Sequence, residues 1–434
     1  MEKIDDILSK CLVCKNVCID SRKAEHGDFF VALQGKNRNG NQYAKDAIEK
    51  GAKYALIDQE EYKLGDQYIL VENALETLQN MARRHRESLS QLDCIAIVGS
   101  NGKTTTKELL YAVLSKKYNT YSTIRNLNNH IGVPINILKC TKKTNIAIIE
   151  MGANHCGEHA LLCQIAKPNY GIITNCGKDH LEGYGSPEGV IQSNNELFDY
   201  LNKNNGHAFV NVDDDLLVRL SSQLSRTFYG FSPHLNNTQS QISITKYQPK
   251  LELAISDGKY TWELKSNLYG TFHASNIAAA VSIGAYFNVG FESMVDAIEK
   301  YVPQNNRSQI MDWNGNTVLL DAYNANPSSV LGMIEYFNDL KEDRKILILG
   351  DMAELGESSF NEHKAIIQRL KLVSNIQLIL VGKEYKPFIE ELSCLYFETT
   401  SELNTFIQQK FPFNKSTILV KGSRRHFLES LFTI

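Results

Sequence analysis

The feature that most constrains the fold is an apolar run that ends in a glycine loop and continues into an amphipathic segment. Residues 92–110 read LDCIAIVGSNGKTTTKELL. Residues 94–98 predict a buried strand, and the apolar residues between Leu109 and Leu114 recur on one face of a helix. A strand, a glycine loop and a helix in this order form a cradle for phosphate, because the loop N–H groups and the helix N-terminus point at the anion.

Two side chains in this loop carry chemistry. Lys103 would reach the terminal phosphates of a nucleotide, and the Thr104 hydroxyl would hold Mg²⁺. The full eight-residue pattern requires a glycine where this chain has Ile97, so only Gly-x-x-Gly-Lys-Thr is present. The alternative is an ordinary turn between a strand and a helix, but the flanking pattern favours phosphate binding. The predicted nucleotide-binding residues of the loop are Gly99, Ser100, Asn101, Gly102, Lys103, Thr104 and Thr105.

Length and charge bound the class of protein. A chain of 434 residues is long enough for two to four domains. A net charge of −3 gives no reason to expect nucleic acid or an anionic membrane as a partner. No run approaches the roughly 18 apolar residues that span a bilayer, and MEKIDDILSK lacks the apolar core of a signal peptide. We therefore expect a cytoplasmic enzyme with no membrane span.

The order of predicted elements divides the chain into three α/β domains, 1–88, 89–303 and 304–434. In the first domain we expect strands at 29–32, 54–57 and 68–71 and a helix at 43–50. In the second we expect strands at 94–98, 145–149 and 171–174 and a hairpin or meander at 239–264. In the third, strands at 318–320, 345–349, 377–381 and 417–420 alternate with helices, which predicts a parallel sheet covered on both faces.

Nine cysteines raise the question of a metal site. Cys11, Cys14 and Cys18 have a spacing that suits a metal cluster, but no fourth ligand stands near them in sequence. Residues 12–22 also have the pattern of a strand. We expect reduced, structural thiols, with a metal cluster as the alternative.

Polar residues follow several of the predicted strands. Glu150 ends the strand beside the phosphate loop, where a carboxylate is well placed for Mg²⁺, and His180 follows the next strand. The alternatives are a carboxylate that caps a loop and a histidine without a role in a site. Three strand ends of the third domain carry Asp321, Asp351 and Lys421. Because the carboxyl ends of parallel strands meet at one edge, we expect a cleft for a charged ligand shared by the second and third domains.

These motifs, taken in order, resemble the Mur ligase family, the ATP-dependent amide-forming enzymes of peptidoglycan synthesis. The resemblance covers nearly the whole chain, and DAYNANP with GDMAELG is most similar to the branch that adds D-alanyl-D-alanine to a UDP-N-acetylmuramoyl tripeptide. The segments that carry it are DSR (20–22), FFVALQGKNRNG (29–40), GSNGKTTTKE, NLNNHIGVP (126–134), EMGA, DHLEGYGS (179–186), NVDD (211–214), HASNIAAA (273–280), NNRSQ (305–309), DAYNANP (321–327), GDMAELG (350–356) and KGSR.

The resemblance implies an N-terminal domain for the UDP-sugar, a central ATPase and a C-terminal Rossmann-like domain. Separately, we expect a monomer, although the sequence does not determine the oligomeric state. The resemblance also implies a mechanism in which the tripeptide carboxylate attacks the ATP γ-phosphate and the dipeptide amine then attacks the acyl phosphate. The implied metal ligands are Thr104, Glu150 and, at a second metal, His180. The remaining implied contacts are Asn276, Arg307, Asp321 and Asn324 for the nucleotide, Ser21, Arg22, Gln34, Gly35 and the rest of the 34–40 loop for the UDP-sugar, and Asn128 and Asn129 for the tripeptide.

One residue departs from the family pattern. Family members carry a carbamylated lysine, two residues before a glutamate, that helps to hold the second Mg²⁺. Glu196 is present here, but the lysine position is Asn194, which cannot form a carbamate. Arg425 is a smaller departure, where the family often has glycine. Two alternatives to an active ligase of this branch therefore stay open: a weakly active relative that binds nucleotide or UDP-sugar, and a sister ligase for another amino acid.

Overall fold

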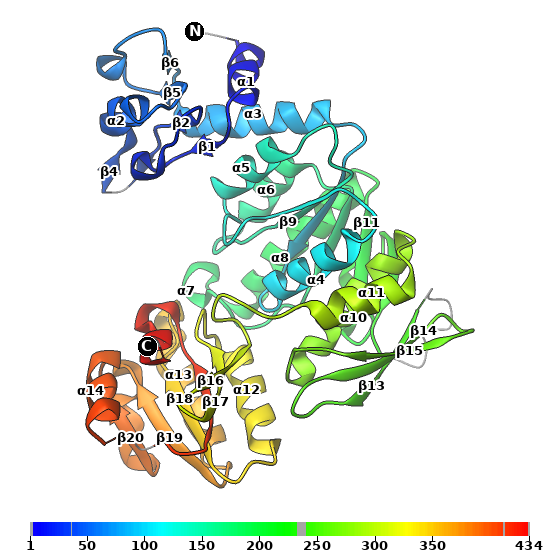
Figure 1. Cartoon of the computed structure of the whole chain (residues 1–434), viewed down its shortest axis with the longest axis vertical. Coiled ribbons are helices and arrows are strands. Elements are labelled where there is room, and N and C mark those ends of the chain that lie inside the picture. The colour runs from blue at the N-terminus through cyan, green and yellow to red at the C-terminus, as the bar shows by residue number, and fades with distance from the viewer. Residues whose placement is uncertain (1–2, 36, 232–239, 411–412, 433–434) are drawn as a thin grey trace.

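The computed structural model describes residues 3–35, 37–231, 240–410 and 413–432. Figure 1 shows three regions with separate sheets: a blue N-terminal region, a cyan-to-green central region and a yellow-to-red C-terminal region. The three-domain α/β expectation is confirmed, while the boundaries after residues 88 and 303 stay predictions. None of the helices in the described ranges is both long and apolar enough to cross a membrane.

The N-terminal region is a small parallel sheet flanked by helices. The predicted strands and the helix at 43–50 are all present, and a further short strand lies at the sheet edge. The sheet order is β1-β2-β5-β6. Its strands are β1 (Val17–Cys18), β2 (Phe29–Val31), β5 (Tyr54–Ile57) and β6 (Tyr68–Leu70), its helices are α1 (Ile4–Leu12), α2 (Ala44–Glu49) and α3 (Ala74–Ser88), and β3 (Gln34–Gly35) pairs with β4 (Arg38–Asn39) in a separate two-stranded sheet.

The predicted strand over residues 12–22 is present only at Val17–Cys18. Helix α1 continues to Leu12, β1 is only two residues long, and a 3-10 turn covers Ser21–Lys23. The Asp20 side chain accepts a hydrogen bond from the Arg22 backbone N–H at 3.1 Å and so starts the turn. Short polar side chains that bond to nearby backbone compete with strand formation, and the apolar pattern alone does not reveal that.

The central region contains a six-stranded parallel sheet of order β12-β11-β10-β7-β9-β8, with β7 among its inner strands. Alternate β7 residues face opposite sides: Ile95 and Ile97 pack with α4 and α10, whereas Cys94, Ala96 and Val98 pack with α5, α6 and α8. The strands are β7 (Asp93–Val98), β8 (Thr120–Ser122), β9 (Ile146–Glu150), β10 (Tyr170–Ile173), β11 (His207–Asn211) and β12 (Ser225–Tyr229), and the helices are α4 (Lys103–Leu114), α5 (Gly132–Lys139), α6 (Glu158–Ala166), α7 (Leu181–Tyr184), α8 (Pro187–Lys203), α9 (Asp215–Leu220), α10 (Ala274–Tyr286) and α11 (Phe291–Lys300).

The predicted meander at 239–264 is present as a separate antiparallel sheet, apart from residue 239, which lies outside the described residues. Its strands are β13 (Gln241–Lys246), β14 (Glu252–Ser256) and β15 (Thr261–Lys265). The inward positions Leu253, Ile255 and Leu264 join the core under α10 and α11. This small sheet lies at the edge of the central region, next to α10 and α11 (Figure 1).

The C-terminal region is a six-stranded mixed sheet of order β16-β17-β21-β18-β19-β20. The four predicted strands are its inner ones and are parallel. Two edge strands were not predicted, and β16 runs antiparallel to β17, so the expectation of a wholly parallel sheet is wrong. The strands are β16 (Gln309–Trp313), β17 (Asn316–Asp321), β18 (Lys345–Gly350), β19 (Ile376–Val381), β20 (Cys394–Phe397) and β21 (Thr417–Lys421), and the helices are α12 (Pro327–Asp339), α13 (Ser359–Leu370) and α14 (Thr400–Lys410).

Candidate active site

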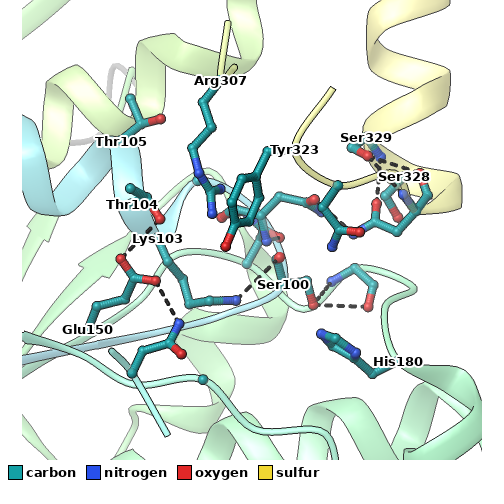
Figure 2. A pocket seen from close by; sticks show the side chains of 18 of the residues that line it. Ser100, Lys103, Thr104, Thr105, Glu150, His180, Arg307, Tyr323, Ser328 and Ser329 are labelled. Carbon is teal, nitrogen blue, oxygen red and sulfur yellow. Dashed lines mark hydrogen bonds between the residues drawn. The ribbon is translucent and has the colours of Figure 1, made fainter. Parts of the chain in front are cut away.

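A cavity of about 790 Å³ lies between the central and C-terminal regions. Its floor is the loop between β7 and α4, and its opposite wall includes the turn between β17 and α12 (Figure 2). The predicted shared cleft is therefore present. The predicted site residues that line it are Ser100, Asn101, Gly102, Lys103, Thr104, Thr105, Asn128, Asn129, Glu150, His180, Asn276, Arg307, Asp321 and Asn324.

Glycine is required at two positions of the loop. Gly99 and Gly102 have φ values of 127° and 82°, in the region that other residues avoid. A Cβ atom on Gly99 would lie 2.1 Å from Thr174 Oγ1, and one on Gly102 would lie 2.7 Å from Asn276 Oδ1. The loop is thus pressed against β10 and α10, and its backbone shape is fixed before any ligand binds.

Lys103 begins α4 and folds back over this loop. Its Nζ donates to the carbonyl oxygen of Gly99 and lies 3.5 Å from that of Ser100. The loop itself is anchored from its other side, where Ser100 Oγ donates to Asp179 Oδ1 at 2.5 Å and the Asn101 N–H donates to Asn175 Oδ1 at 3.1 Å. A cation over a ring of backbone groups is an arrangement that suits an anionic ligand.

Glu150 ends β9 directly beside the start of α4. Its Oε2 accepts from Thr104 Oγ1 at 3.0 Å, and its Oε1 accepts from Asn128 Nδ2 at 2.9 Å. The ammonium of Lys107 lies 3.9 Å from Oε2 and also donates to the Thr123 carbonyl oxygen at 2.8 Å. Glu150 and Lys107 are both almost fully buried. A buried carboxylate without a cation nearby would be costly, so Lys107 explains how this position tolerates an acid.

Lys107 is a residue that sequence reasoning missed. It lies one helical turn after Lys103, inside the quoted GKTTTKE segment. The sequence could have indicated this role, because the helical pattern places Lys107 on the buried side of α4. A buried lysine is rare unless it is paired with an acidic group.

His180 lies at the cavity but contacts the C-terminal region. It has φ 45° at the N-terminus of α7, and its Nδ1 is 2.7 Å from Glu354 Oε2. This interaction lowers the pKa of Glu354. The backbone N–H of Glu182 donates to the Glu354 carbonyl oxygen at 3.1 Å, so the loop after β18 is fastened to α7. In this arrangement His180 and Glu150 do not share a partner.

The predicted nucleotide contacts come together from three elements. The Arg307 guanidinium stacks on the Tyr323 ring with its carbon 3.7 Å from the ring centroid (Figure 2). Lys421 Nζ donates to Asp321 Oδ2 at 2.7 Å and to the Asn324 carbonyl oxygen at 2.6 Å. A flat cation on an aromatic ring next to a buried ion pair forms a wall that suits the planar base and ribose of a nucleotide.

Asn326 is a second residue that sequence reasoning did not assign to the site. It caps α12 with a capping box to Ser329, and its Nδ2 donates to Asn101 Oδ1 at 2.9 Å. That bond joins the phosphate loop to the C-terminal region. The motif DAYNANP placed Asn326 correctly in a polar turn, but a contact to a residue 225 positions away leaves no local signal.

The two asparagines predicted near the tripeptide have different surroundings. Asn128 contacts Glu150, as described, while Asn129 Oδ1 accepts from the backbone N–H groups of Ile131 and Gly132. Asn129 therefore caps the first turn of α5. Its amide nitrogen is the part left to face the cavity.

The residues predicted to hold the UDP-sugar do not line this cavity. Arg22 pairs with Asp20 at 2.8 Å, and Gln34 Nε2 donates to Asp58 Oδ1 at 2.9 Å. Ser21 is buried and Gly35 is exposed, both within the N-terminal region. Residue 36 of the predicted 34–40 loop lies outside the described residues. The N-terminal candidates form a separate group, at the opposite end of the molecule from the C-terminal sheet (Figure 1).

Asn194 lies inside α8 and is almost fully buried. Its Nδ2 donates to the Val190 carbonyl oxygen at 3.0 Å, one helical turn earlier. It does not belong to the cavity lining. The side chain thus bonds within its own helix, while Glu196 accepts from the N–H groups of Gly157 and Ala160 at the start of α6.

Within the described ranges, no group of three or more His, Cys, Asp or Glu side chains is arranged to hold a metal. Cys11 is buried in α1, and burial raises the pKa of its thiol to about 12. Burial also raises the pKa values of Cys14 and Cys18. Thiols in such surroundings are mostly protonated at neutral pH, which is the form that metal ions bind poorly.

Three family models match successive parts of the chain: "Mur ligase family, catalytic domain" over residues 13–86, "Mur ligase middle domain" over 97–284, and "Mur ligase, glutamate ligase domain" over 306–424. The chain is 32% identical over 430 residues to the UDP-N-acetylmuramoyl-tripeptide--D-alanyl-D-alanine ligase of Rickettsia prowazekii, covering 96% of this chain and 94% of that protein. It is also 32% identical to the Bacillus subtilis protein of that name, covering 89% and 84%.

The fold gives the same answer. The crystal structure of MurF from Acinetobacter baumannii superposes with a TM-score of 0.85 at 27% identity, covering 96% of this chain and 92% of that one. The Thermotoga maritima MurF ligase in complex with ADP has a TM-score of 0.82, covering 97% and 96%; at 24% identity it supports the fold alone. The chain belongs to the Mur ligase family.

Proposed function

We propose that this chain is an ADP-forming ligase that joins D-alanyl-D-alanine to UDP-N-acetylmuramoyl-tripeptide in the synthesis of peptidoglycan precursors. The observation that carries the proposal is a cavity in which the loop around Lys103 faces the turn around Asp321 and Asn324. The relatives that match nearly the full chain carry the name of this ligase, which supports this branch of the family over its sisters.

The reaction follows from the chemistry of the substrates. A carboxylate is a poor acyl donor, so a tripeptide carboxylate oxygen first attacks the γ-phosphorus of ATP, forming an acyl phosphate as the bond to ADP breaks. The neutral amine of the dipeptide then attacks the acyl carbon, phosphate leaves with the bonding electron pair, and the amine loses a proton to give the amide. The first step brings an anion toward a phosphoryl group whose oxygens are already negative, and the second builds negative charge on the acyl oxygen. Both steps therefore require nearby positive charge.

The phosphate loop supplies that charge in this proposal. Lys103 Nζ exchanges its contact with the Gly99 carbonyl oxygen for the β- and γ-phosphate oxygens. The backbone N–H groups at the start of α4 bind the same phosphates. Arg307 and Tyr323 hold the base side of the nucleotide, since they form the flat part of the opposite wall.

Magnesium fits the residues present. Thr104 Oγ1 and Glu150 Oε2 lie 3.0 Å apart, and both are hard oxygen donors of the kind Mg²⁺ takes together with phosphate oxygens and water. When bound, Mg²⁺ neutralises charge on the transferring phosphoryl group. We propose His180 as a ligand at a second metal through Nε2, while Nδ1 keeps its contact with Glu354 Oε2.

The test is phosphate release by the purified full-length protein with ATP, Mg²⁺, UDP-N-acetylmuramoyl-tripeptide and a panel of amines. We expect D-alanyl-D-alanine to give the highest kcat/KM. Single amino acids, including glutamate, should release little phosphate above the no-amine control. A panel in which another amine is preferred would identify a sister ligase. No release with any amine would contradict the ligase proposal itself.

The weakly active relative is the second candidate, and the relatives do not favour it. Asn194 is its only motivation, and its amide is already used inside α8. The variant Asn194→Lys, assayed with added bicarbonate, distinguishes the two candidates. If the protein is already an active ligase, the ligation rate should rise less than about twofold. If the site of a weakly active relative lacks the lysine, the rate should rise by an order of magnitude or more. Asn195→Lys, on the next position of the same helix, controls for the added charge.

We also propose that the protein works in the cytoplasm, where ATP and the UDP-linked substrate are made, and as a monomer. Each wall of the cavity comes from the one chain. Light scattering at micromolar concentration should give a mass near 49.0 kDa. A dimer mass that persists on dilution would contradict the monomer.

A further inference from the structure

A line of buried polar side chains runs from the helix of the phosphate loop to the sheet of the C-terminal region. It starts on α4, passes through α10 and the residue that precedes it, crosses into the segment before β16, and ends at the carboxyl ends of β17 and β21. Five of its members are less than a tenth exposed, and the sixth, Asp321, is half-buried with a side chain 15% exposed. In order they are Thr106, Asn276, His273, Ser308, Asp321 and Lys421.

The centre of the line is His273, and its partners fix which nitrogen carries the proton. Asn276 Nδ2 lies 3.1 Å from His273 Nδ1, and an amide nitrogen only donates, so Nδ1 accepts. The remaining nitrogen, Nε2, then carries the hydrogen and donates to Ser308 Oγ at 2.8 Å. Burial lowers the pKa of His273 to about 4, so the ring is neutral at physiological pH and can make both bonds at once.

The first end of the line lies against the phosphate loop. Thr106 Oγ1 donates to Asn276 Oδ1 at 3.2 Å. The same Oδ1 is the atom that a side chain on Gly102 would meet. The position of the Asn276 amide therefore determines how closely α10 approaches the loop that carries Lys103.

The other end lies in the opposite wall of the cavity. The Ser308 backbone N–H donates to Asp321 Oδ1 at 3.1 Å, and Lys421 holds the second oxygen of that carboxylate. Arg307 immediately precedes Ser308 and stacks on Tyr323, which follows Asp321 by two residues. The contacts that hold Ser308 in place therefore also position the stacked Arg307 and Tyr323 in the cavity wall.

His273 borders the cavity, but both of its ring nitrogens are taken by protein partners, so only ring carbons remain for a ligand. A buried polar group that loses its partner is costly to leave unpaired, and a network of this kind holds its members to one geometry. The bonds on the two sides of His273 belong to different regions of the chain.

We propose that His273 is a positioning residue that sets the spacing between the phosphate loop and the C-terminal wall of the nucleotide cavity. The inference rests on the proposed function in one respect, that ATP occupies this cavity. It assigns His273, with Ser308 and Thr106, to the assembly of the ATP site across two regions of the chain.

The main test is a double-mutant cycle of Thr106→Val and Ser308→Ala in the full-length protein, with the Kd for ATP and Mg²⁺ measured by calorimetry. Among the described residues, these two side chains share no hydrogen bond and connect only through Asn276 and His273. We expect each single change to raise the Kd for ATP three- to tenfold. If the two side chains are coupled, the Kd of the double variant should be at least threefold lower than the value obtained by multiplying the two single effects. Independent, multiplying effects would overturn the proposal.

Variants of His273 provide the second test. His273→Gln keeps one donor and one acceptor, whereas His273→Leu fills similar space with neither. We expect the Gln variant to bind ATP within threefold of wild type and the Leu variant to bind at least tenfold more weakly. Equal losses in both would mean that His273 only packs, and would overturn the positioning role; if the Leu variant does not fold, the double-mutant cycle still decides.

Ser282→Ala is the matched control, because Ser282 is a buried serine of α10 that lies outside the line and contacts Ser240. Its ATP affinity should stay within twofold of wild type. Calorimetry needs no ligation, so a wild type that binds ATP but joins no dipeptide would contradict the proposed function and leave the positioning role to be decided by the cycle.

Discussion

The two groups of predicted binding residues are held in different ways. Residues around the cavity are bonded across regions: Asn326 donates to Asn101 at 2.9 Å, and Lys178 pairs with Glu362 at 2.6 Å. In the N-terminal region, Arg22 bonds to Asp20 only two residues away. The cavity is therefore a product of how two sheets meet, whereas the N-terminal group is assembled within one small region. A substrate that uses both must bridge them.

The largest expected effect comes from the cavity floor. Lys103→Met removes the cation of the phosphate loop and should lower the rate of ADP formation by roughly 10²–10³-fold, as losses of transition-state charge stabilisation do. Lys142→Ala, at an exposed position, should leave the rate unchanged. A steady-state ADP assay measures both, and a Lys103→Met enzyme with more than a tenth of wild-type activity would exclude this loop as the phosphate site.

The next effect tests the opposite wall. Lys421→Met leaves the buried carboxylate of Asp321 without its cation and should lower the free energy of unfolding by about 3–5 kcal/mol. Adding Asp321→Leu removes the unpaired charge, so most of the stability should return while ligation stays at least tenfold reduced. Urea unfolding and the ADP assay are run on the same samples. Recovery of activity together with stability would show that this pair serves folding alone.

The third prediction concerns the N-terminal group. Arg22→Ala should raise the KM for UDP-N-acetylmuramoyl-tripeptide roughly tenfold, the cost of one charged contact to a diphosphate, with kcat and ATP affinity within twofold. Lys15→Ala removes another exposed cation of the same region, one that pairs with Glu25, and should change neither. A fall in kcat for Arg22→Ala would contradict this separation, because a residue of the N-terminal group would then affect the chemistry in the cavity.

The last prediction is a pH dependence of stability from two buried histidines, His159 of α6 and His273. Burial lowers the pKa of both His159 and His273 to about 4. An unfolded chain takes up a proton on each near pH 6.5, and the folded chain does not until about pH 4. Stability from these groups is therefore unchanged above pH 6.5 and is lost as the pH falls from 6.5 to 4.

Thermal unfolding at fixed ionic strength measures this loss. Wild type should show a midpoint that falls by several degrees over that range, and His159→Gln should show a shallower slope. A His159→Gln slope identical to that of wild type would mean that His159 is charged, or exposed, in the folded protein.

Sequence patterns predicted the elements that form the cavity better than the contacts within it. The apolar run that ends at Gly99 and the helix that starts at Lys103 have clear hydrophobic patterns. The glycines between them indicate a tight loop, so the places of both elements were predictable. The edge strand β16 was not, because its short and mostly part-exposed sequence carries a weak apolar signal next to the buried inner strands.

Long-range pairs were the least predictable part. Nothing near His273 in sequence shows that its ring reaches Ser308, 35 residues on. The same is true of His180, because nothing near it in sequence shows that its ring reaches Glu354 of the next region. Motif order specified which residues gather at the cavity, and only the packing of the two sheets decides which of them touch.

The close approach of Asn276 to Gly102 bears on when, during its synthesis, the chain becomes able to bind nucleotide. Strand β7 pairs with β9 and β10, which emerge from the ribosome some 50 to 80 residues later, and the loop it carries is supported from behind only after α10 has followed. We expect a nascent chain that stops before residue 270 to bind nucleotide poorly, although it already contains every residue of the phosphate loop. On this expectation, the ability to bind nucleotide should arise late in the folding of the chain.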